Sequence, residues 1–538
     1  MFSGTTPSHF RPRVIAYAII LIALGSWTCF HRLGEGMLIA DEASFAYTTD
    51  HMLQTGDWIV PYIHARNPHL NAAPLYNWLT NLTAPLFGDG NLKYRVWSAV
   101  FGIGCALAAL ALGTLLFRPE VGFLAGLLLL TNVYFLVMHG ARCCVMEAGL
   151  AFCVTTMVAC YVKANSTLTQ PRLWWALTGL CLGLAVLMKP PAMGGFFFVS
   201  LCGYHLVARR DLPWKTRLAG PMVAGCLAFL VALPWYAMIY ARLGMDGLDH
   251  LFLTNSVRRA ADAGRGNTQP MGFYAEHIWS SSLGFRFVLP GLVFGVVCIL
   301  VGWNRRAWGV LVVPTGAFVL AISCSATKHH HYAFPAYPLL SVAAAALLLA
   351  GLTPPRTPER VRTKWFWRSV AILGVAVATN ALWADFRQVA WQVRAERWDY
   401  PAVRFHRALE TELVAGDARL VLYAFPGDRD TLDRKLGVAA HDMYYPATLP
   451  HALRVTTIAD LNRTLADGKP TVVILPPLLT SERLLKAGLT AIPERSLMVR
   501  SDLFPYPVLL FHGAETKLGL TELLGKLELA AGEPAIRP

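Results

Sequence analysis

Long apolar runs with few charges dominate the first 390 residues of this chain. A helix needs roughly 20 such residues to cross the hydrocarbon core of a bilayer. The pattern therefore predicts about 11 to 13 membrane-spanning helices, because two short runs leave room for an extra pair. The runs lie near residues 14–31, 95–117, 120–138, 144–162, 173–189, 191–208, 218–240, 285–303, 307–325, 333–352 and 367–386.

Basic residues indicate the orientation of these helices. Arg11 and Arg13 precede the first run and no small-residue cleavage site follows it, so we expect an uncleaved span with a cytoplasmic N-terminus rather than a signal peptide. The loops that this orientation assigns to the cytoplasm are rich in lysine and arginine, as the positive-inside rule requires. These loop residues are Arg209, Arg210, Lys215, Arg217, Arg305, Arg306, Arg356, Arg360, Arg362 and Lys364.

Three regions are then expected on the outer side of the membrane: residues 32–93, residues 241–283 and everything after about residue 388. In the first region, residues 42–55 and 74–87 carry apolar side chains at helical spacing. Two amphipathic helices along the membrane interface would explain this pattern, and ordinary loop helices packed on protein would explain it equally well.

The tail of the chain lacks long apolar runs. Short stretches such as ARLVLYAF and PTVVILPP are typical of buried strands, and LNRTLADG and SERLLKAG of short helices that end in glycine. We therefore expect an α-helical transmembrane domain over residues 1–387 and a small soluble α/β domain over residues 388–538. The tail has no glycine-rich phosphate loop and no nucleophile elbow, so we expect an accessory role for it.

Composition narrows the class of protein. The chain is 55% hydrophobic and 15% charged, whereas soluble proteins carry about 25% charged residues, so the composition disfavours a soluble protein. Its high hydrophobicity and low charge exclude intrinsic disorder. The net charge is +14, but residues from 388 onward hold 18 basic and 18 acidic side chains, so the excess belongs to the membrane part. It indicates orientation and anionic lipid partners rather than nucleic acid. All 11 cysteines lie between Cys29 and Cys324, mostly in apolar runs, and predict no disulfide framework.

Several ionisable residues at the expected outer ends of spans are candidates for chemistry. Asp41 and Glu42 lie in the first outer loop, where carboxylates could activate a hydroxyl or hold a metal, although Asp41 also fits a helix N-cap. Arg142 and Glu147 flank the start of the fourth span, either as functional groups or as a structural ion pair. Lys189 ends the fifth span, where it could contact a phosphate or extend its ammonium to the interface.

Two further groups of cations are expected on the same side. Arg258, Arg259 and Arg265 lie in the second outer loop, where the positive-inside rule disfavours arginine, and an anionic headgroup would explain them. Lys328, Tyr332 and the three histidines between them lie at another outer span end. Three consecutive histidines on a helix point in different directions, so they do not by themselves predict a closed zinc site. The convergence of these distant residues on one membrane face is more informative than any one motif.

The first outer loop resembles that of a known family of membrane enzymes. IADEASFAYTTDHMLQTGDWIVPYI and PHLNAAPLYNWLTNLTAPLFG resemble the aminoarabinose–lipid A transferases and their protein-mannosyltransferase-like relatives, which are GT-C membrane glycosyltransferases. The family pattern is an Asp-Glu-Ala start, a Gly-Asp-Trp centre and a Pro-Leu-x-x-Trp-Leu helix that ends in Phe-Gly. The matching residues are Asp41, Glu42, Ala43, Gly56, Asp57, Trp58, Pro74, Leu75, Trp78, Leu79, Phe87 and Gly88.

The resemblance covers roughly residues 14–350. GARCCVMEA is similar to the family's Ala-Arg followed five residues later by an acid, and GLAVLMKPP to its Gly-Leu-Ala-x-x-x-Lys-Gly-Pro. LPWYAMIY, the NSVRRA segment with its following QPMGFY, and KHHHYAFPAYPLLSV are similar to further family segments in the same order.

This resemblance implies a GT-C fold and the transfer of a sugar from a polyprenyl phosphate to an acceptor at the outer face of the cytoplasmic membrane. Asp41 matches the catalytic acid, and we take Glu147 as a second catalytic candidate. Lys189 and Arg258 match basic positions that face the donor phosphate, and Arg259 joins them as a candidate. The expected substrate-binding residues are Glu42, His69, Asn71, Arg142, Lys328 and Tyr332.

The chain departs from the family at several donor-site positions. The usual Phe-Glu-Lys-Pro-Pro segment is here Leu70 to Pro74, so that Asn71 replaces an acid used for metal contact and Ala72 a lysine used for phosphate contact. Ser44 replaces an arginine, and Leu253 stands where a metal-ligand histidine is expected. These departures leave no cofactor firmly implied. A divalent metal stays possible but is disfavoured, and a sugar or acceptor other than aminoarabinose and lipid A is favoured. Candidates to replace the lost cations are His64, Arg66 and His69.

Together these features predict a polyprenyl-phosphate-dependent glycosyltransferase of a bacterial inner membrane, with its active site and tail in the periplasm. The resemblance implies a lipid A-like lipid or another envelope molecule as the acceptor, with a protein hydroxyl as an alternative. A non-enzymatic transporter, flippase or degenerate binding protein is the alternative class. Transporters usually contain paired repeats and polar groups at the midplane, and this sequence shows neither. The sugar, the acceptor and the inverting or retaining outcome stay open.

Overall fold

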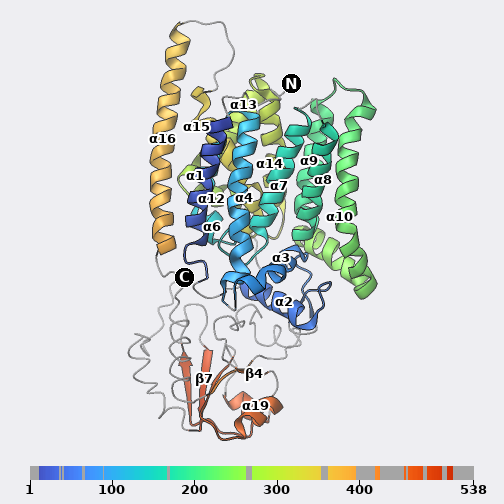
Figure 1. Cartoon of the computed structure of the whole chain (residues 1–538), viewed down its shortest axis with the longest axis vertical. Coiled ribbons are helices and arrows are strands. Elements are labelled where there is room, and N and C mark those ends of the chain that lie inside the picture. The colour runs from blue at the N-terminus through green and yellow to red at the C-terminus, as the bar shows by residue number, and fades with distance from the viewer. Residues whose placement is uncertain are drawn as a thin grey trace.

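The chain folds into a bundle of long helices with a small sheet beyond one end of it (Figure 1). The computed structural model describes residues 11–34, 38, 41–63, 67–88, 90–166, 170–261, 269–352, 361–394, 419–423, 453–455, 458–475, 481–486, 488–499 and 506–512.

The helices of the bundle coincide with the predicted spans. Among the described residues, eight helices are long and apolar enough to cross a membrane, and three shorter apolar helices occupy the remaining predicted runs. The predicted multi-pass α-helical fold is therefore confirmed. These helices are α1 (Arg11–Phe30), α4 (Leu92–Leu116), α5 (Pro119–Leu130), α7 (Glu147–Ala164), α8 (Pro171–Met188), α9 (Ala192–Ala208), α10 (Trp214–Asp249), α13 (Val288–Leu300), α14 (Arg305–Cys324), α15 (Tyr337–Leu348) and α16 (Val361–Arg394).

Several helix ends differ from the apolar runs. The third run continues to residue 138, but α5 stops at Leu130 because the Asn132 side chain accepts a hydrogen bond of 2.9 Å from the Phe135 N–H and begins the short helix α6 (Val133–Val137). α10 bends at Gly244, whose φ of 64° is accessible to glycine at little cost, and it continues beyond the predicted span. α16 likewise runs past the expected domain boundary at residue 387.

Short elements connect the long helices at the end of the bundle that carries α2 (Asp41–Thr55) and α3 (Leu75–Thr83). Both helices match predicted amphipathic segments. On α3, Tyr76 is buried and its hydroxyl donates to the Tyr94 carbonyl at 2.7 Å, whereas Leu82 is exposed. The segment thus packs on protein with one face, as the second alternative expected, and presents the apolar side chain of Leu82 outward with the other. A position along the membrane interface stays a prediction. The remaining short elements at this end are β1 (Tyr62–Ile63), β2 (Asn67–Pro68), η2 (Ala84–Leu86), η3 (His250–Arg258), α11 (Arg259–Ala261), α12 (Phe273–Ser280), η4 (Gly284–Phe287) and η5 (His330–Ala336). The short helix η6 (Ala350–Leu352) lies at the opposite end, where the Leu352 carbonyl accepts a hydrogen bond from Arg118 between α4 and α5.

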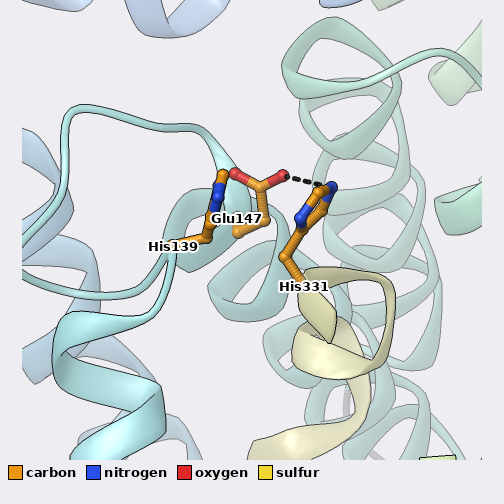
Figure 2. A group of neighbouring side chains, drawn as sticks. All are labelled: His139, Glu147 and His331. Carbon is orange, nitrogen blue, oxygen red and sulfur yellow. Dashed lines mark ion pairs between the residues drawn. The ribbon is translucent and has the colours of Figure 1, made fainter. Parts of the chain in front are cut away.

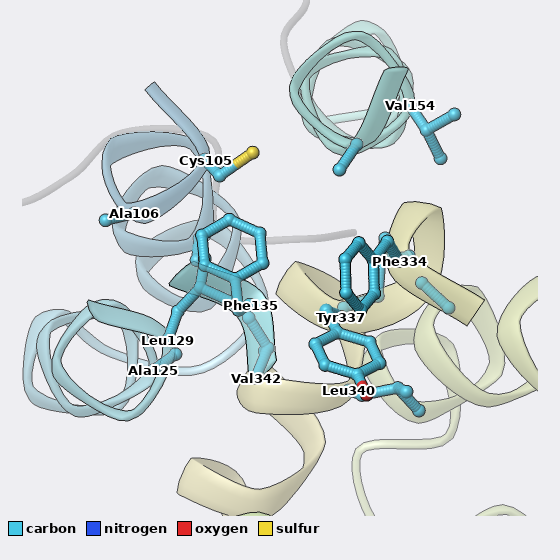
Figure 3. Packing of buried hydrophobic residues seen from close by; sticks show 14 of the residues in the cluster. Cys105, Ala106, Ala125, Leu129, Phe135, Val154, Phe334, Tyr337, Leu340 and Val342 are labelled. Carbon is cyan, nitrogen blue, oxygen red and sulfur yellow. The ribbon is translucent and has the colours of Figure 1, made fainter. Parts of the chain in front are cut away.

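Aromatic side chains fill the centre of the bundle, where α4, α5, α7 and α15 meet (Figure 3). The ring centroids of Phe135 and Phe334 are 6.5 Å apart, and those of Phe334 and Tyr337 are 5.0 Å apart. Small residues let the backbones approach, since a Cβ atom on Gly113 of α4 would lie 2.5 Å from the Cα atom of Gly122 on α5. This packing fixes α6, η5 and the start of α7 relative to one another.

A buried carboxylate connects α16 to the rest of the bundle. Asp385 accepts hydrogen bonds from the backbone N–H groups of Leu283 at 2.7 Å and Gly284 at 2.8 Å, at the start of η4. The N-terminal N–H groups of a helix have no intrahelical partner and favour an anion. Asp385 therefore completes the N-terminus of the η4–α13 segment, although most of α16 is exposed at the edge of the bundle.

The tail contains a mixed sheet of five strands in the order β4-β3-β5-β7-β6. β3 is parallel to β4 and β5, while β7 is antiparallel to β5 and β6. β3 and β5 occupy the two predicted strands, and two helices occupy the predicted helical stretches before glycines with positive φ, Gly468 and Gly488. Figure 1 places this sheet beyond the end of the bundle that carries α2 and α3. The elements are β3 (Arg419–Tyr423), β4 (Leu453–Val455), α19 (Ile458–Leu465), β5 (Thr471–Ile474), α20 (Ser481–Lys486), β6 (Arg495–Val499) and β7 (Tyr506–Phe511).

Candidate active site

Glu42 fixes the start of α2 against the bundle. Its buried carboxylate accepts hydrogen bonds from Arg95 on α4, at 2.8 Å from Nε and 3.0 Å from Nη2, and from the Cys144 backbone N–H at 2.6 Å. A bidentate arginine–carboxylate pair restrains orientation as well as distance. Three segments are therefore held at one point. The predicted contact of Glu42 with substrate stays a prediction, since its carboxylate is engaged within the protein.

Asp41, the first residue of α2, consequently lies beside the loop between α6 and α7. Its Oδ2 atom is 3.8 Å from Nδ1 of His139, and the two side chains are 40% and 32% exposed, respectively. The structure thus presents a carboxylate that is accessible from outside and adjacent to an imidazole. A proton acceptor needs both accessibility and a fixed position, and Asp41 has both.

The loop that carries His139 has an unusual backbone. His139 has a φ of 59°, in the left-handed region that a histidine adopts only at a cost. At Gly140 a Cβ atom would lie 1.7 Å from the Phe135 carbonyl oxygen, so only glycine fits this approach. Sequence analysis did not select His139, because an isolated loop histidine has no spacing pattern. The neighbouring glycine was the one available indication of a tight backbone.

Arg142 fixes the same loop to the end of α1. Its guanidinium is buried, and burial lowers the pKa of Arg142. It donates to carbonyl groups at the C-terminus of α1, which have no partner within that helix. The bonds are 2.8 Å to Thr28, 3.2 Å to Cys29 and 2.9 Å to His31. The ion pair with Glu147 that was the structural alternative is therefore not formed, and a substrate contact by Arg142 stays a prediction.

Glu147 pairs instead with Lys189. Lys189 follows the last residue of α8 in an extended conformation, and its Nζ atom lies 2.9 Å from Oε1 of Glu147, the first residue of α7. The side chains are 14% and 4% exposed, respectively. Nζ of Lys189 also lies 5.3 Å from the ring centroid of Tyr332. Three predicted site residues from distant segments thus meet.

His331 contacts both Glu147 and His139, and in the view of Figure 2 the two imidazoles lie on either side of the Glu147 carboxylate. Nε2 of His331 is 3.8 Å from Oε1 of Glu147, and the rings of His331 and His139 stack with centroids 4.5 Å apart. Asp41, His139, His331 and Glu147 therefore form a continuous group, which we call the acid–histidine row. Lys189 lies at its inner end, next to Glu147.

The other two histidines of the predicted cluster take different places. His330 pairs with His277 on α12, with their Nδ1 atoms 3.0 Å apart, which requires one ring to donate and the other to accept. Burial, together with the neighbouring His330, lowers the pKa of His277 to about 4. His329 stacks on His331 with centroids 5.4 Å apart. The expected divergence of the three rings thus holds for His330.

Two more predicted substrate residues have partners within the protein. Lys328 is buried, and its Nζ donates to the Ser325 carbonyl at 2.7 Å, just past the end of α14. His69 is buried against α2, with Nδ1 3.2 Å from the Thr48 hydroxyl, and Asn71 follows it in the adjoining turn. Contacts of these three residues with substrate stay predictions.

The predicted phosphate-binding arginines lie at the end of η3. Arg258 is exposed, as is Leu253 in the same segment, and Arg259 begins α11. Asn255 donates to the Leu70 carbonyl at 2.6 Å, which ties this segment to the first outer loop. The structure does not bring Arg258 into the acid–histidine row. His64, Arg66 and Arg265 lie outside the described residues.

This geometry combines a partly exposed carboxylate with a mostly buried ammonium. Asp41 is able to accept a proton from a hydroxyl or to orient a polar substrate. Lys189 is able to stabilise a phosphate charge in a site of low dielectric, where such a charge otherwise costs much free energy. An incoming phosphate would share Lys189 with Glu147.

Comparisons with known sequences agree with this picture. The family described as dolichyl-phosphate-mannose-protein mannosyltransferase matches residues 20–243. Undecaprenyl phosphate-alpha-4-amino-4-deoxy-L-arabinose arabinosyl transferase 2 of Pseudomonas fluorescens is 27% identical over 283 residues, which cover 51% of this chain and 47% of that protein. The corresponding transferase of Yersinia pestis is 27% identical over 273 residues, covering 50% and 46%. The matches thus span about half the length of these relatives.

Solved structures extend the likeness to the fold. ArnT from Cupriavidus metallidurans bound to undecaprenyl phosphate superposes with a TM-score of 0.64 at 16% identity, covering 94% of this chain and 98% of ArnT. The oligosaccharyltransferase of Archaeoglobus fulgidus has a TM-score of 0.54 at 12% identity, covering 82% and 64%. The predicted GT-C fold and the predicted resemblance to the aminoarabinose transferases are therefore confirmed.

Proposed function

We propose that this chain is a membrane glycosyltransferase that moves a sugar from a polyprenyl phosphate to a lipid acceptor of the cell envelope. The observation that carries the proposal is the convergence of Asp41, Glu147 and Lys189 at one end of the bundle. The names of the relatives support the donor class, since they describe transfer of a sugar carried on undecaprenyl phosphate. The ArnT structure was determined with undecaprenyl phosphate bound.

The charges of the site fit the departure of a phosphate. When the bond from the sugar to the polyprenyl phosphate breaks, negative charge develops on the phosphate oxygens, and a fixed cation stabilises it. Lys189 supplies such a cation. Asp41 removes the proton of a hydroxyl acceptor, or orients the sugar if the acceptor is itself a phosphate. The Glu42–Arg95 pair keeps Asp41 in place.

We also propose that the site faces the periplasm from the inner membrane. α9 leads from just after Lys189 to just before Arg209, and α14 leads from Arg305 and Arg306 toward η5, which carries His331, so these arginines lie at the far ends of helices that approach the site. Arginine-rich loops are retained in the cytoplasm, so the site end is the outer one. A donor built in the cytoplasm would then have to be presented on the outer leaflet.

A transfer assay with one conservative variant tests the function. The purified protein is incubated with labelled polyprenyl-phosphate sugars and with a lipid A, a phospholipid or a protein acceptor. We expect transfer to a lipid, and we expect Asp41→Asn to reduce the rate by about 10²–10⁴-fold, the usual contribution of a positioned general base. Asp211→Asn, an exposed carboxylate at the other end of the bundle, is the matched control.

Two results would contradict the proposal. If folded Asp41→Asn protein kept nearly full transfer activity, the role of Asp41 would be to stabilise the N-terminus of α2 and not to take part in the reaction. Movement of intact labelled donor across a proteoliposome membrane, without transfer to any acceptor, would favour the transporter class instead.

A further inference from the structure

Three side chains that commonly bind transition metals meet in the middle of the candidate site. Each of His139, Glu147 and His331 offers one ligand atom, and these atoms all lie within 4.8 Å of one another (Figure 2). The residues come from the α6–α7 loop, the start of α7 and η5. We propose that they bind one divalent transition metal ion of the Zn²⁺ type. The proposal concerns metal binding and can be tested whether or not sugar transfer is observed.

The donor set favours zinc over the hard cations. Two imidazoles and one carboxylate, with a fourth position left open, form a ligand set of zinc sites that bind water or substrate. Mg²⁺ and Ca²⁺ prefer oxygen ligands throughout. Bonds of about 2.1 Å place tetrahedral ligands about 3.4 Å apart, so the atoms need to approach by about 1.4 Å at most.

One oxygen of the Glu147 carboxylate accepts a hydrogen bond, and the other has no partner among the described residues. Oε1 accepts from Lys189 and is the oxygen nearer His331. Oε2 is buried and has no hydrogen-bond partner among the described residues. In Figure 2 this second oxygen lies on the side of the carboxylate that faces His139. Buried polar atoms normally have a partner, so an unsatisfied oxygen on the side that faces His139 is consistent with a metal ligand.

The backbone at His139 is consistent with a constrained ligand. Its left-handed conformation is unfavourable for histidine and persists only where the surroundings determine it. It brings the His139 ring parallel to that of His331, with an angle of 27° between them. Asp41 lies near Nδ1, as carboxylates often do beside a metal-bound histidine, which leaves Nε2 for the metal.

The local charge also favours a cation. Asp41 and Glu147 supply two carboxylates against the single ammonium of Lys189. Lys189 opposes a second cation, but it contacts Oε1 and leaves Oε2 accessible to the metal. Asn71 and Leu253, which occupy the metal-ligand positions of the family that the sequence resembles, are not members of this group. The proposed site is therefore built from a different set of residues.

Metal content and cobalt spectroscopy test the site directly. The full-length protein in detergent is stripped with a chelator, dialysed against Zn²⁺ and measured by mass spectrometry for zinc per chain, and a second sample is titrated with Co²⁺. We expect one zinc ion per chain and the intense visible absorption of four-coordinate Co²⁺. His139→Gln, Glu147→Gln and His331→Gln should each lower the affinity by about 10-fold or more, whereas His205→Gln, a buried histidine on α9, should not.

Each outcome decides the proposal. Absence of zinc and of the cobalt spectrum in the wild-type protein would overturn it, and this result does not depend on the folding of any variant. Equal zinc binding by all four variants would also overturn it, because the metal would then lie elsewhere. Loss of metal in the three ligand variants would establish the site. Transfer activity of the stripped wild-type protein would then show separately whether the reaction uses the metal.

Discussion

Replacing Lys189 by methionine separates its contribution to stability from its contribution to donor binding. The ammonium is 2.9 Å from Oε1 of Glu147, whose side chain is only 4% exposed. Removing one partner of a buried ion pair leaves the other charge uncompensated and costs about 3–5 kcal/mol. Lys189 is 14% exposed, so some water reaches the pair, and we expect a loss near the lower end, about 3 kcal/mol.

The double variant Lys189→Met with Glu147→Gln removes both charges of the pair. It should recover most of the lost stability, because a neutral amide no longer leaves a buried charge, and the two changes should be strongly non-additive. Affinity for the donor should not recover, because the single variant Lys189→Met and the double variant both lack the ammonium of Lys189. Losing a charge-assisted contact with a phosphate costs about 2–5 kcal/mol, which weakens binding by about 30-fold to 5,000-fold.

Two measurements on the same proteins test this reasoning. Thermal unfolding in detergent reports stability, and isothermal titration with undecaprenyl phosphate reports affinity. Lys163→Met, at the far end of α7, is the matched lysine control and should change neither. Recovery of donor affinity in the double variant would refute a direct contact between Lys189 and the phosphate. An unchanged unfolding temperature for Lys189→Met would refute the estimated cost of the buried pair.

Three further predictions concern the surroundings of the site. Arg142→Met should lower the free energy of unfolding by about 3 kcal/mol, because three carbonyls at the end of α1 lose their hydrogen-bond donor. Thermal unfolding measures this loss, and the control variant Arg172→Met, at an exposed arginine, should have little effect. His277 has a pKa of about 4 in the folded protein, below the usual 6.5, so the unfolded state binds a proton at a higher pH than the folded state does. The free energy of unfolding should therefore fall by up to about 3 kcal/mol as the pH decreases from about 6.5 to 4. Unfolding curves that keep the same pH dependence in His277→Gln would contradict this. A cysteine at exposed Lys469 should react with an impermeant maleimide from the periplasm, and protection alongside a labelled periplasmic control would place the tail in the cytoplasm.

The helices of the bundle could be predicted from the sequence because hydrophobicity over about 20 residues is a local property. The residues at which these helices end were harder to predict. The early stop of α5 depends on one asparagine, Asn132, whose side chain replaces the continuing helix as partner of a backbone N–H. The strands of the tail were recognisable for the same local reason, but their order in the sheet depends on contacts between distant segments.

The sequence predicted which residues belong to the candidate site better than it predicted which of them contact one another. Asp41, Glu147 and Lys189 were candidates as ionisable residues at the outer ends of spans, and the resemblance to the transferases supplied the expected roles of Asp41 and Lys189. The partner of each depends on how the helices pack, so Arg142 contacts the end of α1 rather than Glu147. His139 joins the site through a left-handed backbone that no pattern of side chains reveals.

The bond between Asp385 and the start of η4 affects how the protein is made. The two groups are 102 residues apart in the chain, so at 5–20 residues per second about 5–20 s pass between synthesis of Leu283 and synthesis of its acceptor. During that time the N–H groups at the first turn of the η4–α13 segment lack this acceptor. α16 therefore acts as a late closing element, and a chain released before residue 385 would present an incomplete helix end to membrane quality-control proteases.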